Sequence, residues 1–206
     1  MKKILLLTAA ALLVACTPMN QQVENAMTAY NSRNYAAAVP VFQKAAQQGD
    51  SRAQLMLGKC YDFGQGVTKN AREAAKWYRA AAEGGNANAQ DNLGTCYALG
   101  SGVPVDLNQA FQWYARSAQQ GNDSAYNNMG LCYRNGEGVM QNAEQAAACF
   151  RRAAELGNTD GMYNLGRCYF HGLGVPQDET QARLWVGKAA AAGHKNAAAF
   201  MQDNQW

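Results

Sequence analysis

A five-residue motif recurs in this chain at intervals of 36 residues. The first copy is Leu57-Gly58-Lys59-Cys60-Tyr61, and it returns at residues 93–97, 129–133 and 165–169, with Met129 replacing the leucine in one copy. A strict period of this length is typical of a solenoid, in which each unit stacks only on its neighbours. We therefore expect most residues that follow the period to serve packing.

Each unit reads as two helices separated by a glycine loop. In the copy that runs from Ser51 to Gly85, small and apolar residues at helical spacing predict helices over residues 53–63 and 71–83. Gly64 and Gly66 fall in the loop, where glycine suits a turn with positive φ. Because the loop follows a helix and occurs four times, the sequence favours a turn over a phosphate-binding loop, which follows a strand.

Each first helix also carries a glycine in its interior, at Gly58, Gly94, Gly130 and Gly166. Such a glycine costs up to ~1 kcal/mol relative to alanine, which is tolerable where the missing side chain lets a neighbouring helix approach. We expect the matching small positions of the second helices to be Ala38, Ala74, Ala110, Ala146 and Ala182.

These residues resemble the Sel1-like repeat, a longer-looped relative of the tetratricopeptide repeat. The pattern is nearly complete in one unit, at Ala89, Leu93, Gly94, Tyr97, Gly100, Gly102, Val103, Ala110, Trp113, Tyr114, Ala118 and Gly121. Departures are Cys149-Phe150 and Trp185-Val186 in place of the Trp-Tyr pair, and Gly161 in place of the first alanine.

The resemblance implies an all-α fold, a right-handed α/α superhelix of helix pairs. The four repeats are expected at residues 51–86, 87–122, 123–158 and 159–194. The ends differ from the repeats, as capping units do. We expect residues 23–50 to form a tetratricopeptide-like cap and residues 195–206 a capping half-repeat.

The N-terminus has the pattern of a processing signal. Lys2 and Lys3 precede an apolar run over residues 4–13, and the run ends in Leu13-Val14-Ala15-Cys16. This junction resembles the lipobox of bacterial lipoproteins, which implies that residues 1–15 are removed, that Cys16 carries the lipid (palmitate among its acyl chains), and that residues 16–22 form a tether. By the same resemblance, Thr17 favours an outer-membrane, periplasm-facing location. The alternative is a plain secretory signal with an incidental cysteine.

The charge balance gives no indication of a nucleic-acid partner. The chain has 18 basic and 15 acidic side chains, and removal of Lys2 and Lys3 leaves 16 against 15. A net charge this close to zero does not point to the basic footprint that is typical of nucleic-acid-binding domains.

Four cysteines follow the period, at Cys60, Cys96, Cys132 and Cys168. Equivalent positions in stacked units are at least ~8–10 Å apart, too far for a disulfide, so we interpret them as small buried hydrophobes. Cys149 departs from the pattern, and a bridge from it to Cys132 or Cys168 stays open. No Cys-x-x-Cys pair occurs, so no metal site is expected.

No catalytic motif is present, and no cofactor is expected. The two histidines, His171 and His194, belong to no His-Glu-x-x-His motif, and His194 is interpreted as a solvated loop residue. Beta-lactamase activity has been suggested for some Sel1-like proteins, but the chain contains no Ser-x-x-Lys. A hydrolase of this kind remains an alternative, because groups assembled across repeats escape motif searches.

Function is expected on the concave surface that first helices of a solenoid line. In tetratricopeptide-like stacks the lining positions correspond here to Leu55, Lys59, Asp62, Phe63, Asp91, Thr95, Ala98, Leu99, Asn127, Leu131, Arg134, Asn135, Tyr163, Arg167, Phe170 and His171. The residues expected to bind a partner are Lys59, Asp62, Arg134, Tyr163, Arg167, Phe170 and His171.

This composition predicts an adaptor for a protein or peptide that carries anionic groups. Tyr163, Arg167 and Phe170 share one helix face, and arginine with aromatic residues is typical of binding hot spots. The alternatives are ordinary solvated helix residues, or a glycan-binding envelope factor that uses Tyr163, Asn127 and Asn135.

Overall fold

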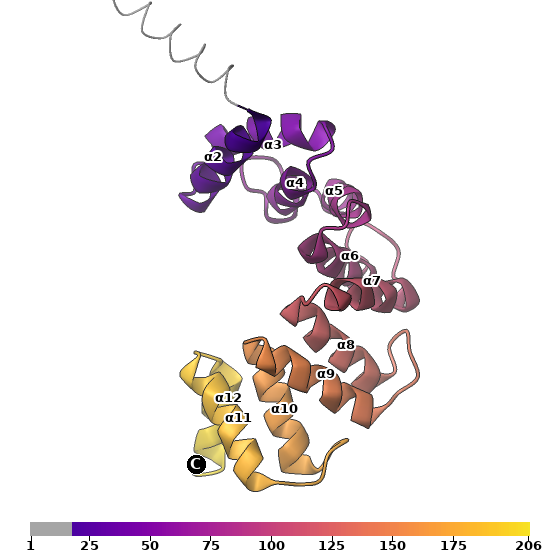
Figure 1. Cartoon of the computed structure of the whole chain (residues 1–206), viewed down its shortest axis with the longest axis vertical. Helices are drawn as coiled ribbons and strands as arrows, with labels where there is room; N and C mark the ends of the chain where they lie inside the picture. Colours follow the sequence, from indigo (N-terminus) through magenta and orange to yellow (C-terminus); the bar gives the residue numbers. More distant parts are fainter. Residues whose placement is uncertain (1–17) are drawn as a thin grey trace, which may run out of the picture. The chain divides into compact units, whose positions relative to one another are not determined.

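The computed structural model describes residues 18–206, which form eleven α-helices (Figure 1). Consecutive helices pair in antiparallel fashion through short loops, so the prediction of an all-α fold of helix pairs is confirmed. Cys16 and the expected signal peptide lie outside the described residues.

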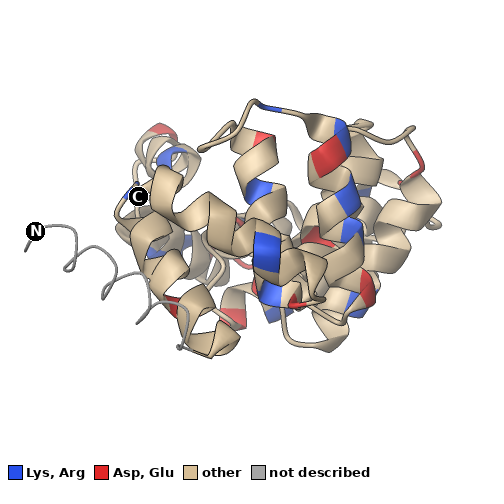
Figure 2. Ribbon diagram, turned by 90° about the horizontal axis from the view of Figure 1, so that it is seen from above, with Lys and Arg blue, Asp and Glu red and all other residues tan. Residues whose placement is uncertain are grey.

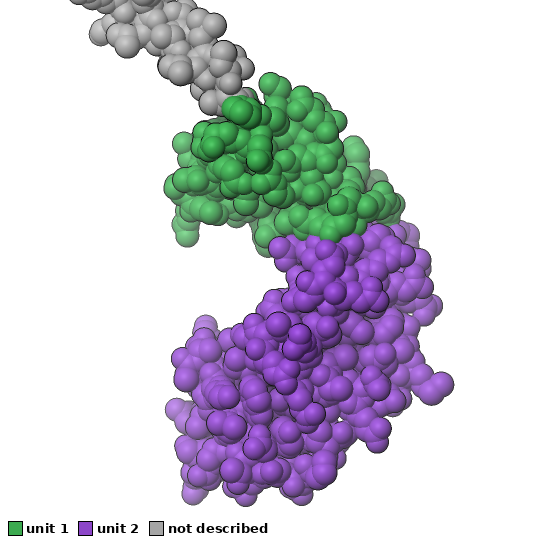
Figure 3. Space-filling view, in the orientation of Figure 1, with its two compact units in different colours: residues 1–86 green, residues 87–206 purple. Residues whose placement is uncertain are grey.

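The chain divides into two compact units at Asn86 (Figure 3). The helices of unit 1 are α2 (Met19–Asn31), α3 (Tyr35–Gln47), α4 (Ser51–Phe63) and α5 (Ala71–Glu83). The helices of unit 2 are α6 (Ala87–Leu99), α7 (Leu107–Gln119), α8 (Asp123–Asn135), α9 (Ala143–Glu155), α10 (Thr159–His171), α11 (Glu179–Ala191) and α12 (Lys195–Asp203).

The expected tether is shorter than the sequence indicated. Residues 19–22 belong to α2, and Val23 is fully buried in the core of unit 1 together with Ala26 and Phe42. The tether assignment was wrong from Met19 onward, because Val23 and Ala26 give α2 an apolar face that packs against α3.

Side-chain caps explain why the second helices begin where they do. The residue before each helix accepts a hydrogen bond from a backbone N–H of the first turn, and these caps are Asn34, Asn70, Asp106, Asn142 and Asp178. Their spacing is the 36-residue period of the repeat. Such a cap is worth about 1 kcal/mol because it satisfies an orphan donor.

The loop glycines behave as predicted. Gly64, Gly136 and Gly172 end their helices with φ of 69°, 75° and 67°, a left-handed conformation that strains other residues. The second glycine of the last two loops allows close approach: a Cβ on Gly138 would overlap the carbonyl of Leu107, and one on Gly174 the carbonyl of Ala143.

The interior glycines accommodate large side chains, which refines the expectation of matching alanines. A Cβ on Gly94 would lie 2.7 Å from the ring of Tyr114, and one on Gly130 would lie 2.5 Å from the ring of Phe150. The alanine backbone contributes at Gly94, where the carbonyl oxygen of Ala110 is 3.1 Å from the same point. Gly58, Gly94 and Gly130 therefore accommodate the aromatic ring that lies one turn after the alanine, and Gly166 accommodates Val186 at the same place.

The periodic cysteines are buried, as predicted. Cys60, Cys96, Cys132 and Cys168 have exposed fractions of 0 to 6%, and these four and Cys149 are free thiols. Burial raises the pKa of Cys60, Cys132 and Cys149 to about 11. A raised pKa keeps each thiol neutral and poorly reactive at physiological pH.

Candidate functional site

The residues expected to bind a partner fall in both units. Lys59 and Asp62 lie on α4 of unit 1, where both are partly exposed. Asp62 accepts a hydrogen bond of 3.2 Å from the hydroxyl of Tyr78. The other five lie on α8 and α10 of unit 2, so most of the predicted binding site belongs to unit 2.

Part of the expected lining surface holds unit 2 together. Asn128 donates to Asp91 over 2.9 Å, and Asn164 donates to Asn127 over 2.8 Å, so side-chain hydrogen bonds join α6 to α8 and α8 to α10. Burial raises the pKa of the Asp91 carboxyl, and the hydrogen bond from Asn128 opposes that rise. These positions therefore fix the spacing of the first helices.

Tyr163 and Phe170 also differ from the expectation of free aromatic rings. The centroid of Tyr163 lies 4.6 Å from that of His194, and the centroid of Phe170 lies 5.1 Å from Phe200 and 5.6 Å from Trp206. Both rings thus pack against the C-terminal segment that includes α12. Asn127 is 7% exposed, so of the three residues that favoured a glycan site, Asn135 alone is exposed and free of this packing.

His194 is not the solvated loop residue that the sequence indicated. Its side chain is 13% exposed, its Nδ1 accepts from the backbone N–H of Ala197, and its Nε2 lies 3.0 Å from an oxygen of Asp160. The period could have revealed this role. Asp50, Asn122 and Asn158 cap the first helices α4, α8 and α10, and His194 stands 36 residues after Asn158.

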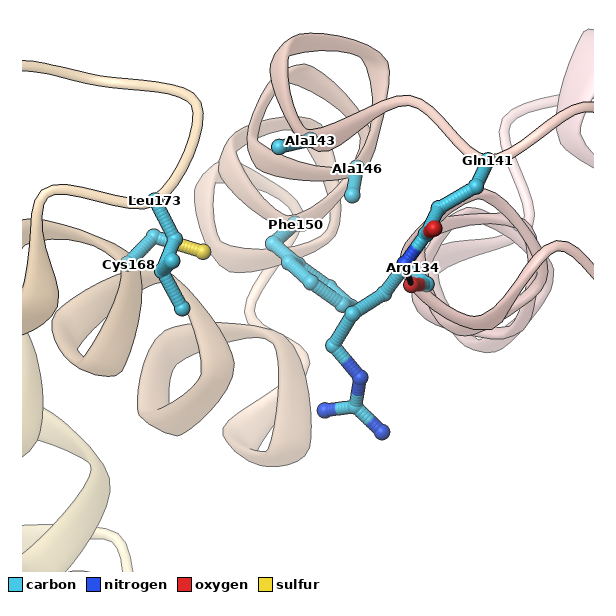
Figure 4. A pocket seen from close by; sticks show the side chains of 7 residues that line it. All are labelled: Arg134, Gln141, Ala143, Ala146, Phe150, Cys168 and Leu173. Carbon is cyan, nitrogen blue, oxygen red and sulfur yellow. Dashed lines mark hydrogen bonds between the residues drawn. The ribbon is translucent and has the colours of Figure 1, made fainter.

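A cavity of about 420 Å³ lies where α8, α9 and α10 meet, and we call it the arginine cavity (Figure 4). It is lined by Arg134, Gln141, Ala143, Ala146, Phe150, Cys168 and Leu173. Leu173 and Cys168 stand on one side of Phe150, and Arg134 and Gln141 stand on the other (Figure 4). Of the predicted partner-binding residues, Arg134 alone lines this cavity.

Contacts made by the two neighbouring loops explain the positions of the walls of the arginine cavity. The amide of Gln141 donates to the backbone carbonyl of Arg134 over 2.8 Å, which holds the loop after α8 against the end of that helix. On the other side, Gly174 allows the loop after α10 to approach Ala143, and this places Leu173 at the cavity. Sequence reasoning missed Gln141, Ala143 and Leu173 because they lie outside the repeated motif.

The preceding junction, between α6, α7 and α8, has a smaller cavity of about 240 Å³, which we call the upstream cavity. Its lining includes counterparts one period earlier: Ala98 for Arg134, Leu107 for Ala143, Ala110 for Ala146, Tyr114 for Phe150, Cys132 for Cys168 and Glu137 for Leu173. The two cavities share a template but differ at five positions: the arginine, the small residue at the start of α9, the leucine in the loop, the aromatic ring, which is Tyr114 or Phe150, and Gln141, whose counterpart is Val105.

The electrostatics of the two cavities are opposite. Burial raises the pKa of Cys168, whereas Arg134 and Arg167 lower it; at Cys132 burial and the charge of Glu137 both raise the pKa. Arg134 bonds through Nε to Asn135 over 3.1 Å, and Arg167 lies over the ring of Tyr163 at 5.8 Å. Among residues 18–206 neither arginine forms an ion pair.

Elsewhere on the described helices, basic and acidic residues are interspersed (Figure 2). Within residues 18–206, no cluster of three histidine, cysteine, aspartate or glutamate side chains has the arrangement of a metal site. In the same range, no helix has both the length and the apolar character to cross a membrane.

Comparison with solved structures places the fold among bacterial repeat proteins. A Sel1 repeat protein from Oxalobacter formigenes is 36% identical over 79% of this chain and 64% of its own length, with a TM-score of 0.76. A protective antigen present in uropathogenic Escherichia coli strains, with an SLR fold, is 35% identical over 87% of this chain and 39% of its own length, with a TM-score of 0.79. The chain therefore spans less than two thirds of the length of either relative.

A more distant structure shows the same fold: a Sel1 repeat protein from Klebsiella pneumoniae is 20% identical, with a TM-score of 0.61 over 91% of this chain and 93% of its own. No curated protein matches the chain. The sequence profile of the Sel1 repeat matches residues 33–50, 51–86, 87–122, 123–158 and 159–194. The chain therefore belongs to the Sel1 repeat family.

Proposed function

We propose that this chain is a non-enzymatic adaptor that binds a protein or peptide on the surface around the arginine cavity. The observation that carries the proposal is an apolar cavity beside two arginines that lack ion-pair partners among the described residues. Arginine beside an apolar pocket is the composition of interaction hot spots. Sel1 repeats form scaffolds for protein interaction, which supports the same function.

The proposal includes a lipid anchor in the bacterial envelope. Residues 1–15 act as a signal peptide, and Cys16 becomes the lipidated N-terminus of an outer-membrane protein that faces the periplasm. A lipid on the N-terminal cysteine holds the repeats near the membrane without a transmembrane helix. Labelling with radioactive palmitate tests this part: the native chain should incorporate label, and Cys16→Ser should not.

Site-specific photocrosslinking in living cells tests the binding function. A photoreactive residue is placed at Asn135 or Leu173, both exposed and adjacent to the cavity residues, and a matched one at Ala148, which is exposed on α9 but does not line the cavity. We expect one discrete protein adduct from the first two positions and none from Ala148. Absence of adducts at all three positions, in cells that express the chain at its native level, would overturn the adaptor function.

A further inference from the structure

The chemistry of the arginine cavity defines the ligand more narrowly. Its floor is a stripe of α9 at positions i, i+3 and i+7, formed by Ala143, Ala146 and Phe150. Leu173 and Cys168 form one wall, so the lining is mostly apolar. Burial of an apolar group here is favourable in proportion to the area removed from water.

The polar groups stand at one side of this apolar floor. Arg134 presents the two Nη groups of its guanidinium, because its Nε already donates to Asn135. Gln141 uses its amide nitrogen on the carbonyl of Arg134, which leaves its carbonyl oxygen as an acceptor. The site therefore offers a fork of donors for a carboxylate and one acceptor for a backbone N–H.

The charge around the cavity selects an anion. Arg134 and Arg167 both act on Cys168 electrostatically, so their fields overlap at the cavity. The expected lining positions of α8 and α10 contain no aspartate or glutamate. Glu137, in the loop after α8, accepts a hydrogen bond of 3.0 Å from Asn135 and forms no ion pair with Arg134. An anionic group that reaches Arg134 would therefore meet a guanidinium that no carboxylate of residues 18–206 already pairs with, which favours pairing.

The shape excludes flat ligands that stack on exposed rings. Phe150 is 1% exposed, so its face is not open to a sugar or a nucleobase. The cavity lies within the usual size range of ligand pockets, roughly 300–1,000 Å³, and an extended peptide places neighbouring side chains in different directions. One apolar side chain can thus enter while its neighbour remains at the rim.

We propose that the arginine cavity binds an acidic peptide segment of a partner protein, whose apolar side chain enters between Ala143 and Leu173 while an adjacent Asp or Glu carboxylate pairs with Arg134. This inference rests on the proposed adaptor function and names the chemical class of its ligand. The sequence supplies a test of it, because the upstream cavity carries Ala98, Leu107 and Glu137 in place of Arg134, Ala143 and Leu173.

The test uses the full chain, purified in detergent, and an array of short peptides in which a central Ala, Leu or Phe is flanked by Glu, Gln or Lys. We expect binding to the Glu-flanked Leu or Phe peptides, and weaker binding when Gln replaces Glu or Ala replaces the central residue. Arg134→Ala should weaken binding by about tenfold or more, because it removes a charge-assisted pair. Ala143→Leu should also weaken binding because the larger side chain fills the cavity, and Leu173→Glu because it places a negative charge beside the bound carboxylate. Both variants should fold, since the preceding repeat has Leu107 and Glu137 at these positions.

The control is Arg152→Gln, which removes one positive charge on α9 at a side chain that pairs with Glu155. Its affinity should match that of the native chain. Equal binding of Gln-flanked, Lys-flanked and Glu-flanked peptides, or full binding by Arg134→Ala and Ala143→Leu, would overturn the inference. If the array shows no selective binding while the Asn135 and Leu173 crosslinks persist, the ligand class is wrong and the adaptor function stands.

Discussion

The arginine cavity and the upstream cavity are built on one 36-residue template, yet they present opposite chemistry. Both have a first-helix glycine beneath an aromatic ring, Gly94 under Tyr114 and Gly130 under Phe150. They differ at positions outside the repeated motif: Leu107 and Glu137 border the smaller cavity, and Ala143 and Leu173 border the larger one. The shared residues determine how the helices pack, and the residues that differ determine which ligand each cavity could bind.

The largest expected effect concerns the shared part of the template. Gly130→Ala places a methyl group 2.5 Å from the ring of Phe150, and such overpacking should lower the free energy of unfolding by about 1–3 kcal/mol. Urea unfolding followed by circular dichroism measures this change.

Gly187→Ala is the matched control, since Gly187 also lies inside a helix but a methyl group there meets only Met201 at 3.8 Å. This variant should be neutral or more stable by up to ~1 kcal/mol, because alanine favours the helix. Equal effects of the two variants would show that the ring contact does not constrain the helix.

The second prediction converts one cavity into the other. The quadruple variant Ala98→Arg, Val105→Gln, Leu107→Ala, Glu137→Leu gives the upstream cavity the arginine, the glutamine, the small residue and the leucine of the arginine cavity. We expect a second peptide site with an affinity within about tenfold of the first, because the apolar floor and the charge are both reproduced. Isothermal titration with the best array peptide should then give a stoichiometry near two. A stoichiometry of one would mean that residues beyond these four are required.

The two cavities show which parts of the structure could be predicted from the sequence. The period predicted the helix pairs, the loop glycines and the burial of the cysteines, because every unit must pack against an identical neighbour. The lining positions of tetratricopeptide-like stacks included Arg134, and this residue does line the arginine cavity, while its role in binding stays a prediction. The cavity itself was not predictable, because Gln141 and Leu173 reach it from two different loops. The path of the first depends on the close approach of Gly138 to Leu107, and that of the second on the approach of Gly174 to Ala143.

At the C-terminal end, the structure differs from the surface that the sequence predicted. Tyr163 and Phe170 were expected on a free surface, but Phe200 and Trp206 pack against them. The last half-repeat lacks the Leu-Gly-x-Cys-Tyr motif, so a pattern of repeats gave no signal for these contacts. A rule derived from interior units therefore misjudges surfaces that a terminal helix covers.

The third prediction tests this end of the stack. His194→Ala removes both the cap on Ala197 and the contact with Asp160, and it should cost about 0.5–2 kcal/mol of stability, as the loss of a helix cap does. His194→Asn should retain most of that stability, because Asn158 occupies the equivalent position and both caps α10 and donates to Asp123. Chemical unfolding of the two variants measures the difference, and equal losses would show that the ring of His194 against Tyr163 matters more than the cap.

The smallest expected effect compares the thiols that line the two cavities. Only the thiolate reacts with iodoacetamide, and Arg134 and Arg167 oppose the rise in the pKa of Cys168, whereas Glu137 adds to the rise that brings Cys132 to about 11. As pH rises from neutral, Cys168 should therefore begin to react at a lower pH than Cys132, although the two side chains are similarly buried. Mass spectrometry of the folded protein after timed alkylation measures both rates.

Removal of each charge should move the two rates in opposite directions. Arg134→Ala takes away a positive charge that stabilises the Cys168 thiolate, so its pKa should rise and its rate at a fixed alkaline pH should fall by about threefold. Glu137→Gln takes away a negative charge near Cys132, so that thiol should react faster. Cys60 in unit 1 owes its raised pKa to burial alone and should keep its rate in both variants. A change at Cys60, or a parallel change at Cys132 and Cys168, would mean that the substitutions loosen the fold, and the opposite charges of the two cavities would then not explain their reactivity.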